Sequence, residues 1–376
     1  MKSITRLLSI LLAVMLVTAG FAVPVRAETR YDAAIRACYE GLKARRTAGA
    51  RLLSDPAFLA DAGTTGSDWT AFALARYEAG GEPLIAEDYA AFADALEDKL
   101  DARLSEGLTA ATKYTDLYRM LLTLGALGRG KPDAVRAVTA ELPVKLTRLN
   151  VVTLSYALLL GGDFRGTYAA ADFVAMLLSR RHTDGGWTLN AALSPSSDPD
   201  VTAIALTALS GFRGDPTPYP VGDATLTVNE AIEAGLARLS AMQQADGGFI
   251  SYGTKNAESA AQVILALTTL GLDPETDPRF VKNGRSVADA LLSFRLPDGA
   301  FTHAFEADPA NPGATAGQYN GMATDQALLA LVALRRAGAG QSGVFVLSQP
   351  AARLTANEIF RRLIRLLLAA LRLLRT

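Results

Sequence analysis

Three short stretches decide the fold of this chain: Asp184-Gly185-Gly186-Trp187, Asp246-Gly247-Gly248-Phe249 and Asp298-Gly299-Ala300-Phe301. Each follows a segment with helical periodicity and precedes a second, more apolar one. Aspartate and glycine are typical of a helix end followed by a turn with positive φ. We expect the aromatic side chain to pack the turn onto the core. The three stretches are therefore predicted to be structural turns that mark a repeated unit of two helices.

The second helix of this unit recurs along the whole chain. The segment Asp200-Val-Thr-Ala-Ile-Ala-Leu-Thr-Ala-Leu aligns without gaps with Asp325-Gln-Ala-Leu-Leu-Ala-Leu-Val-Ala-Leu. Similar segments start at residues 68, 116, 150 and 261, and a more amphipathic helix precedes each copy. A helix that is apolar on most faces is buried on all sides. The sequence therefore predicts an all-α fold, an (α/α)6 toroid with six inner and six outer helices. An open solenoid is the alternative, but it would need polar terminal repeats.

The composition excludes several classes of protein. The chain has 376 residues, of which 50% are hydrophobic and 20% charged, which is typical of a globular protein. Its one cysteine allows neither an internal disulfide nor a cysteine-rich zinc site. The net charge of -1 gives no general attraction to nucleic acid. We therefore predict no metal, no cofactor and no nucleic-acid partner.

Both ends of the chain differ from the repeats. Residues 1–27 resemble a secretory signal peptide, with Lys2 and Arg6 before an apolar core and a small-residue site ending at Ala27. We expect a secreted or extracytoplasmic protein with the toroid over residues 28–338, a linker over 339–354 and a cationic amphipathic helix over 355–376. That helix would place its arginines on a narrow face and its leucines on a broad one. It could lie on an anionic membrane surface, dock on the toroid or pair with a partner.

Acidic residues recur where the inner helices are predicted to begin. In a closed ring these helix ends lie on one face together with the Asp-Gly turns. The acids either cap the helices, because carboxylates accept hydrogen bonds from free backbone N–H groups, or form an acidic mouth that binds a ligand. The candidate ligand-binding residues at the mouth are Asp68, Trp69, Asp116, Asp325 and Glu258. A further hypothesis pairs Asp246 with Glu258 for glycoside cleavage.

The repeats resemble the prenyltransferase and squalene-cyclase repeat superfamily, and most closely its secreted bacterial branch. Residues 239–249 (Leu-Ser-Ala-Met-Gln-Gln-Ala-Asp-Gly-Gly-Phe) and 256–262 (Asn-Ala-Glu-Ser-Ala-Ala-Gln) carry this resemblance. It implies an α/α toroid. Class II terpene cyclases of the superfamily protonate an alkene with the middle aspartate of an Asp-x-Asp-Asp-Thr-Ala motif. Here Asp198-Pro-Asp200-Val-Thr-Ala places Asp200 on the proton donor and Asp198 on the first aspartate, whereas Val201 replaces the third.

Other branches of the superfamily fit the sequence less well. The prenyltransferase branch implies a zinc site of Asp, Cys and His, but Cys38, His182 and His303 form no such set in the sequence. The corrinoid carriers imply a second, β domain, for which no room follows residue 338. We therefore favour a non-catalytic toroid that binds an apolar small molecule or a cell-surface partner. The alternatives are a cyclase-like enzyme that uses Asp200 and a structural surface module.

Overall fold

The computed structural model of the chain is built almost entirely of helices. It describes residues 29–46, 51–78, 87–109, 111–140, 149–160, 169–189 and 194–347. The predicted signal peptide and the predicted amphipathic helix lie outside these ranges. Within the described ranges, no helix is both long and apolar enough to cross a membrane.

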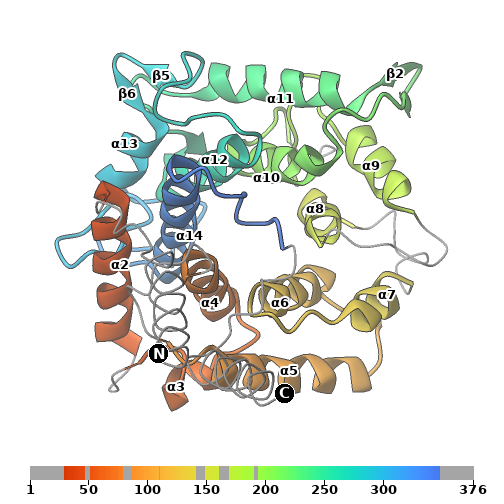
Figure 1. The fold of residues 1–376 in the computed structure, drawn as a ribbon. Helices are drawn as coiled ribbons and strands as arrows, with labels where there is room; N and C mark the ends of the chain where they lie inside the picture. Colours follow the sequence, from red (N-terminus) through yellow and green to blue (C-terminus); the bar gives the residue numbers. More distant parts are fainter. Residues whose placement is uncertain are drawn as a thin grey trace, which may run out of the picture.

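Six inner helices surround the centre of the molecule (Figure 1). Each packs against the next one along the chain, and the last packs against the first, so the ring is closed. Buried alanine and leucine dominate these helices, which explains how they pack closely on several sides. The inner helices are α4 (Thr65–Glu78), α6 (Tyr114–Ala126), α8 (Val151–Leu159), α10 (Pro199–Leu209), α12 (Ala257–Thr269) and α14 (Gly321–Gly338).

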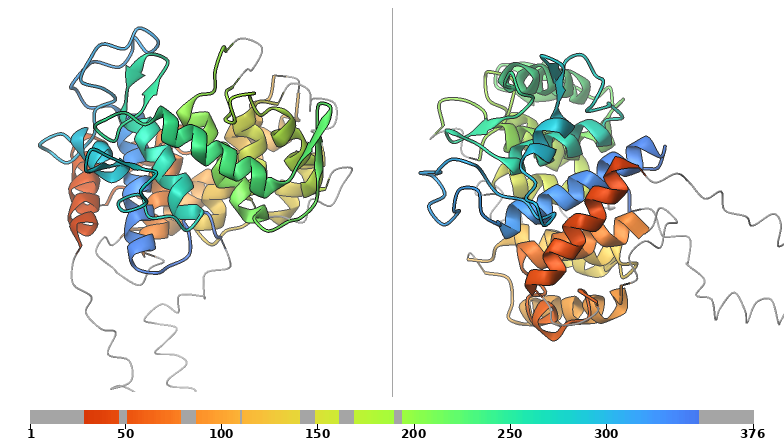
Figure 2. Two further views of the ribbon diagram at one scale, coloured as in Figure 1. Left: turned by 90° about the horizontal axis from the view of Figure 1, so that it is seen from above. Right: turned by 90° about the vertical axis from the view of Figure 1, so that its left-hand side faces the viewer.

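Six outer helices form a second layer around the ring (Figures 1 and 2). From α7 onward each outer helix packs against the inner helix that precedes it, and α5 packs against both α4 and α6. The first outer helix, α2, instead packs against α14 and closes the outer layer. These helices are α2 (Arg30–Arg46), α5 (Tyr89–Ser105), α7 (Pro132–Ala140), α9 (Ala170–Ser179), α11 (Val228–Met242) and α13 (Val287–Ser293). The predicted all-α toroid is confirmed.

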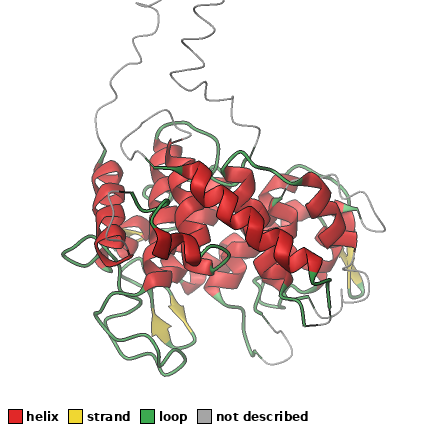
Figure 3. Ribbon diagram, turned by 90° about the horizontal axis from the view of Figure 1, so that it is seen from below, coloured by secondary structure: helices red, strands yellow, loops and turns green. Residues whose placement is uncertain are grey.

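The remaining elements are short. Helix α3 (Pro56–Ala60) lies between α2 and α4, and a 3-10 turn (Ser210–Phe212) follows α10. Three antiparallel hairpins lie in the loops, as the strands in Figure 3 show. They pair β1 (Tyr219–Val221) with β2 (Ala224–Leu226), β3 (Ile250–Ser251) with β4 (Thr254–Lys255), and β5 (Val281–Lys282) with β6 (Arg285–Ser286).

The N-termini of the inner helices lie on one face, which we call the mouth. Side-chain contacts near these N-termini join neighbouring helices around the ring. Thr70 of α4 donates to Asp325 of α14 at 2.6 Å, and the hydroxyls of Thr115 and Thr153 lie 2.6 Å apart between α6 and α8. The inner helices are therefore parallel to one another, as the repeat predicted.

The caps of the inner helices differ from the prediction in detail. Asn150 caps α8 as expected, but Asp198, and not Asp200, caps α10. Asn256 caps α12, which begins four residues before the predicted start at Ala261. Asn320 caps α14, so Asp325 lies within the helix. The repeat does not predict the caps Asn256 and Asn320, because it is aligned on its aspartates.

The three Asp-Gly turns share one hydrogen-bonded geometry. In each, the aspartate accepts the N–H two residues on, at 3.0–3.2 Å, and the next residue is a glycine with φ between 85° and 99°. The aromatic residues Trp187, Phe249 and Phe301 are fully buried. Gly185 and Gly247 each approach the backbone of the next outer helix or its cap, at Ala234 and Ser286. These contacts favour a structural role for the three turns.

The third turn, at Asp298 and Gly299, contacts the first outer helix, α2, and so joins the end of the ring to its start. Arg45 of α2 forms an ion pair with Asp298. A Cβ on Gly299 would lie 2.2 Å from the carbonyl oxygen of Ala37 in α2, far inside van der Waals contact.

We predict that Gly299→Ala destabilises the fold by about 2–4 kcal/mol, because positive-φ strain and overpacking add at one site. Urea unfolding at neutral pH measures this loss. Gly271→Ala is the matched control, since Gly271 also has positive φ (74°) but has open space around it. Equal losses in the two variants would contradict the role of Gly299 in ring closure.

Candidate functional site

Asp200 lies in the first turn of α10 and faces the mouth. Its Oδ1 atom is buried and accepts no hydrogen bond from any described residue. Burial raises the pKa of Asp200 to about 8, and the charges of Asp198 and Glu258 add to the shift. The nearby Ser259 hydroxyl and His303 act in the opposite direction without cancelling it. Asp200 is therefore largely protonated at neutral pH, as a proton donor must be.

Asp198, two residues earlier, is stabilised as a carboxylate by three donors. Its Oδ1 accepts the backbone N–H groups of Asp200 (3.0 Å) and Val201 (3.2 Å), and its Oδ2 accepts the hydroxyl of Ser251. Burial raises the pKa of Asp198, and these hydrogen bonds oppose that rise. When the two aspartates share one proton, the donors favour placing it on Asp200. Both aspartates are predicted from the sequence, but the cap of α10 is Asp198 and not Asp200.

A buried histidine between two carboxylates lies beside Asp200. His303 Nδ1 is 2.9 Å from Glu258 Oε2, and His303 Nε2 is 2.9 Å from Asp308 Oδ2. All three residues are buried. The hydrogen bond to Glu258 raises the pKa of His303 to about 9, with Asp308 adding to the effect. At neutral pH the imidazolium donates one hydrogen bond to each of the two carboxyl groups.

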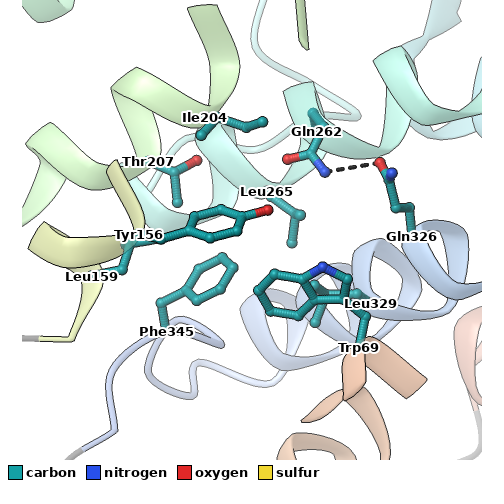
Figure 4. A pocket seen from close by; sticks show the side chains of 10 residues that line it. All are labelled: Trp69, Tyr156, Leu159, Ile204, Thr207, Gln262, Leu265, Gln326, Leu329 and Phe345. Carbon is teal, nitrogen blue, oxygen red and sulfur yellow. Dashed lines mark hydrogen bonds between the residues drawn. The ribbon is translucent and has the colours of Figure 1, made fainter. Parts of the chain in front are cut away.

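A small, narrow pocket lies inside the ring, with a cavity volume of about 20 Å³, which is room for about one water molecule. One turn beyond Asp200 and Glu258, its wall includes Ile204 and Gln262. Gln262 donates to Gln326 of α14 at 2.9 Å (Figure 4). The ring centroids of Trp69 and Tyr156 lie 5.5 Å apart and join α4 to α8. The remaining lining residues are Leu159, Thr207, Leu265, Leu329 and Phe345.

The chain that follows α14 closes the pocket at the end away from the mouth. Val344 is fully buried, and the Phe345 ring lies 6.2 Å from Trp69 and 5.4 Å from Phe72, centroid to centroid. Two buried arginines hold this segment by its carbonyl groups. Arg76 donates to Val346 at 3.0 Å, and Arg336 donates to Ser342 at 2.9 Å. The first part of the predicted linker thus forms the floor of the pocket.

The other acidic residues predicted for the mouth form ion pairs within the fold. Arg119 binds Asp68 at 3.0 Å and Asp116 at 2.7 Å. Burial raises the pKa of Asp68 to about 6 against the opposing charge of Arg119. Asp325 accepts from Thr70 and lies 3.8 Å from Arg46, and burial raises its pKa to about 7. These contacts favour a structural role for the three acids.

The predicted pairing of Asp246 with Glu258 is not what the structure shows. Asp246 forms an ion pair with Lys255, and Glu258 binds His303. Sequence analysis also missed Asp308, Gln262 and Gln326. Helical periodicity places Gln262 on the same face as Glu258, one turn later, and so could have suggested it. By contrast, no sequence pattern links His303 to Glu258, 45 residues earlier, or to Asp308, 5 residues later.

Metal binding has no support in this part of the chain. Across the described residues, no three His, Cys, Asp or Glu side chains are arranged to hold a metal ion. Cys38 is buried, and burial raises the pKa of its thiol far above the usual range.

Comparisons with known proteins support the fold. No family model and no curated protein matches the sequence. Among solved structures, the chain is similar to a possible member of the GH105 family from Salmonella enterica serovar Paratyphi A. The TM-score is 0.51 at 12% identity, and the match covers 84% of this chain and 96% of the other. At this identity the likeness establishes the class of fold, an α/α toroid, and nothing finer.

We predict that His303 makes the stability of the fold depend on pH. The pKa of His303 rises from 6.5 to about 9 on folding, so the folded protein binds its proton more tightly than the unfolded chain does. The resulting contribution to the free energy of unfolding is fully present below pH 6.5 and is lost as the pH rises through 9. His303→Gln should therefore lower the melting temperature by on the order of 5 °C at pH 6. The difference from the unmodified protein should shrink towards pH 9.5. Differential scanning calorimetry at both pH values tests this, and a difference that does not change with pH would contradict it.

Proposed function

We propose that this chain is an enzyme that cleaves a glycosidic bond at the mouth of the toroid. One observation carries the proposal: Asp200, whose pKa burial raises to about 8, has a buried Oδ1 atom with no hydrogen-bond partner among the described residues, while the nearby Glu258 binds His303 at 2.9 Å. Two carboxyl groups in opposite protonation states are what glycoside hydrolysis needs. Fold similarity to a possible GH105 glycoside hydrolase is consistent with this chemistry but does not establish it.

The proposed reaction divides the work between the two acids. Asp200 gives its proton to the oxygen of the leaving sugar while the glycosidic bond breaks. Water attacks the anomeric carbon, and Glu258 accepts the proton that water loses. His303 holds Glu258 in place through Nδ1, and Asp308 in turn orients His303. Atoms and charge balance, because one proton leaves Asp200 and one arrives on Glu258.

The pocket inside the ring is too small for a sugar ring, because its cavity volume is about 20 Å³. We therefore propose that the saccharide lies across the mouth, at Asp200 and Glu258, and does not enter the pocket.

A screen for hydrolysis tests the proposal. The purified full chain is incubated with plant and bacterial oligosaccharides, and products are identified by mass spectrometry. We expect release of a sugar from at least one class of substrate. If no oligosaccharide is cleaved or bound, the proposal is wrong.

A second candidate is the ligand-binding module favoured by the sequence. The apolar pocket closed by Phe345 supports it, and a ligand bound there would have to displace lining side chains, because the cavity volume is about 20 Å³. A cyclase that uses Asp200 would need room for an isoprenoid in the same pocket. Mass spectrometry of the molecules that co-purify with the protein distinguishes the ligand-binding module and the cyclase from the proposed glycosidase. We also propose that residues 1–27 direct secretion and that residues 355–376 attach the protein to an anionic membrane surface, to the toroid or to a partner.

A further inference from the structure

The β3–β4 hairpin, residues 250–255, lies beside the acids of the mouth. Ile250 pairs with Lys255 and Ser251 with Thr254, which leaves Tyr252 and Gly253 as a two-residue turn. Ser251 donates its hydroxyl to Asp198, so the hairpin is fixed directly to the site. The next residue after the hairpin, Asn256, caps α12 two residues before Glu258.

The turn holds a tyrosine where the backbone disfavours one. Tyr252 has φ of 48° and Gly253 has φ of 94°, which is the geometry of a type I′ turn. The β5–β6 hairpin makes the same turn with Asn283 (φ 49°) and Gly284 (φ 74°), the pair that such turns prefer. Tyr252 and Asn283 are the two non-glycine residues with positive φ in the described part of the chain. A bulky residue there is strained, and such strain is common at functional sites.

The surroundings of Tyr252 do not compensate for this strain by burial. The residue is 61% exposed, and Ile250, two residues earlier in the same hairpin, is 42% exposed. Its hydroxyl nevertheless lies close to the site. Partial burial raises the pKa of Tyr252, and the charges of Asp198 and Asp200 add to the shift. The exposed ring belongs to the hairpin that Ser251 ties to Asp198, two residues before the buried, unpartnered carboxyl oxygen of Asp200, so it is carried at the edge of the proposed site.

We propose that Tyr252 is the stacking platform for a sugar ring adjacent to the bond that Asp200 protonates. This rests on the proposed function and adds a binding subsite to it. The exposed aromatic face takes the C–H face of the ring, while Ile250 adds exposed apolar surface from the same hairpin. Stacking at this position would hold the glycosidic oxygen near Asp200, so Tyr252 sets affinity and orientation and is not itself a proton donor.

The test uses the β5–β6 hairpin as a control, because it makes the same type of turn as the β3–β4 hairpin. In Tyr252→Asn, the turn acquires the preferred Asn-Gly pair, so we expect the melting temperature to stay the same or rise. Binding to oligosaccharides on an array, measured in the Asp200→Asn background to prevent turnover, should weaken about tenfold, and Tyr252→Trp should restore it. Asn283→Tyr is the control, since it places the same strain in a hairpin outside the proposed site. It should lower stability and leave binding unchanged.

The outcomes separate the two proposals. If the protein carrying only Asp200→Asn binds oligosaccharides and the added Tyr252→Asn change does not weaken that binding, the platform is wrong and the proposed function stands. If Tyr252→Asn unfolds the protein more easily, Tyr252 has a structural role and the platform is again wrong. If oligosaccharides neither bind nor are cleaved, both proposals fail.

Discussion

Asp200→Asn is expected to lower kcat/KM for the saccharide found in the screen by about 10²–10⁴-fold, the usual contribution of a general acid. Asparagine has nearly the same shape but carries no acidic proton to give to the leaving oxygen. The fold should survive, because Oδ1 of Asp200 accepts no hydrogen bond from the described residues. Initial rates of product release at neutral pH, compared with the unmodified protein, measure the effect.

The pH dependence of the fold provides an independent check on Asp200. An acid whose pKa rises from 3.8 to about 8 on folding binds a proton in the folded state that the unfolded chain has lost. It therefore destabilises the fold progressively as the pH rises from about 4 to 8. Asp200→Asn removes this contribution, so the variant should be more stable than the unmodified protein at pH 8 and lose that advantage near pH 4.

A matched acid controls for general effects of removing charge. Asp246 lies at a neighbouring turn and pairs with Lys255 on the surface. We expect Asp246→Asn to retain most of the activity. If Asp246→Asn and Asp200→Asn reduce activity equally, or if neither reduces it, Asp200 is not the proton donor.

The sequence predicts this fold well because the toroid is encoded locally. Each Asp-Gly turn carries its own conformational signal, and the three turns repeat the same hydrogen bonds at Asp184, Asp246 and Asp298. Because the sequence contains six such units, it also predicts that the last unit packs against the first, as α14 does against α2. Helix starts were less predictable, since Asn256 and Asn320 cap as well as aspartate does and the repeat was aligned on acids.

The site was only partly predictable, and the reason is distance along the chain. Asp198, Asp200 and Glu258 stood out as acids near predicted helix starts. The partner that gives Glu258 its role, His303, comes from a loop 45 residues later. Phe345 lies in a segment that looked like a linker, and its burial depends on carbonyl contacts with Arg76 and Arg336 that side-chain patterns do not reveal.

The largest expected loss of stability comes from Arg119→Ala. Arg119 is 4% exposed and donates to Asp68 at 3.0 Å, to Asp116 at 2.7 Å and to the carbonyl of Gly63 at 2.9 Å. Its removal leaves Asp68, which is fully buried, without its compensating charge. Breaking a buried pair in this way costs about 3–5 kcal/mol. Urea unfolding at pH 7 measures the loss.

Two comparisons test whether the burial of the Arg119–Asp68 ion pair causes the expected loss of stability. Arg129 is 43% exposed and pairs with Asp94 and Glu97 on the surface, so Arg129→Ala should cost no more than about 1 kcal/mol. Burial already raises the pKa of Asp68 to about 6 with Arg119 present, so without the arginine Asp68 should be protonated at still higher pH. A neutral Asp68 needs no partner charge, and the penalty of Arg119→Ala should therefore shrink at pH 4.5. Adding Asp68→Asn should likewise recover part of the loss at pH 7. A penalty that matches that of Arg129→Ala would mean that the ring does not depend on this ion pair between α4 and α6.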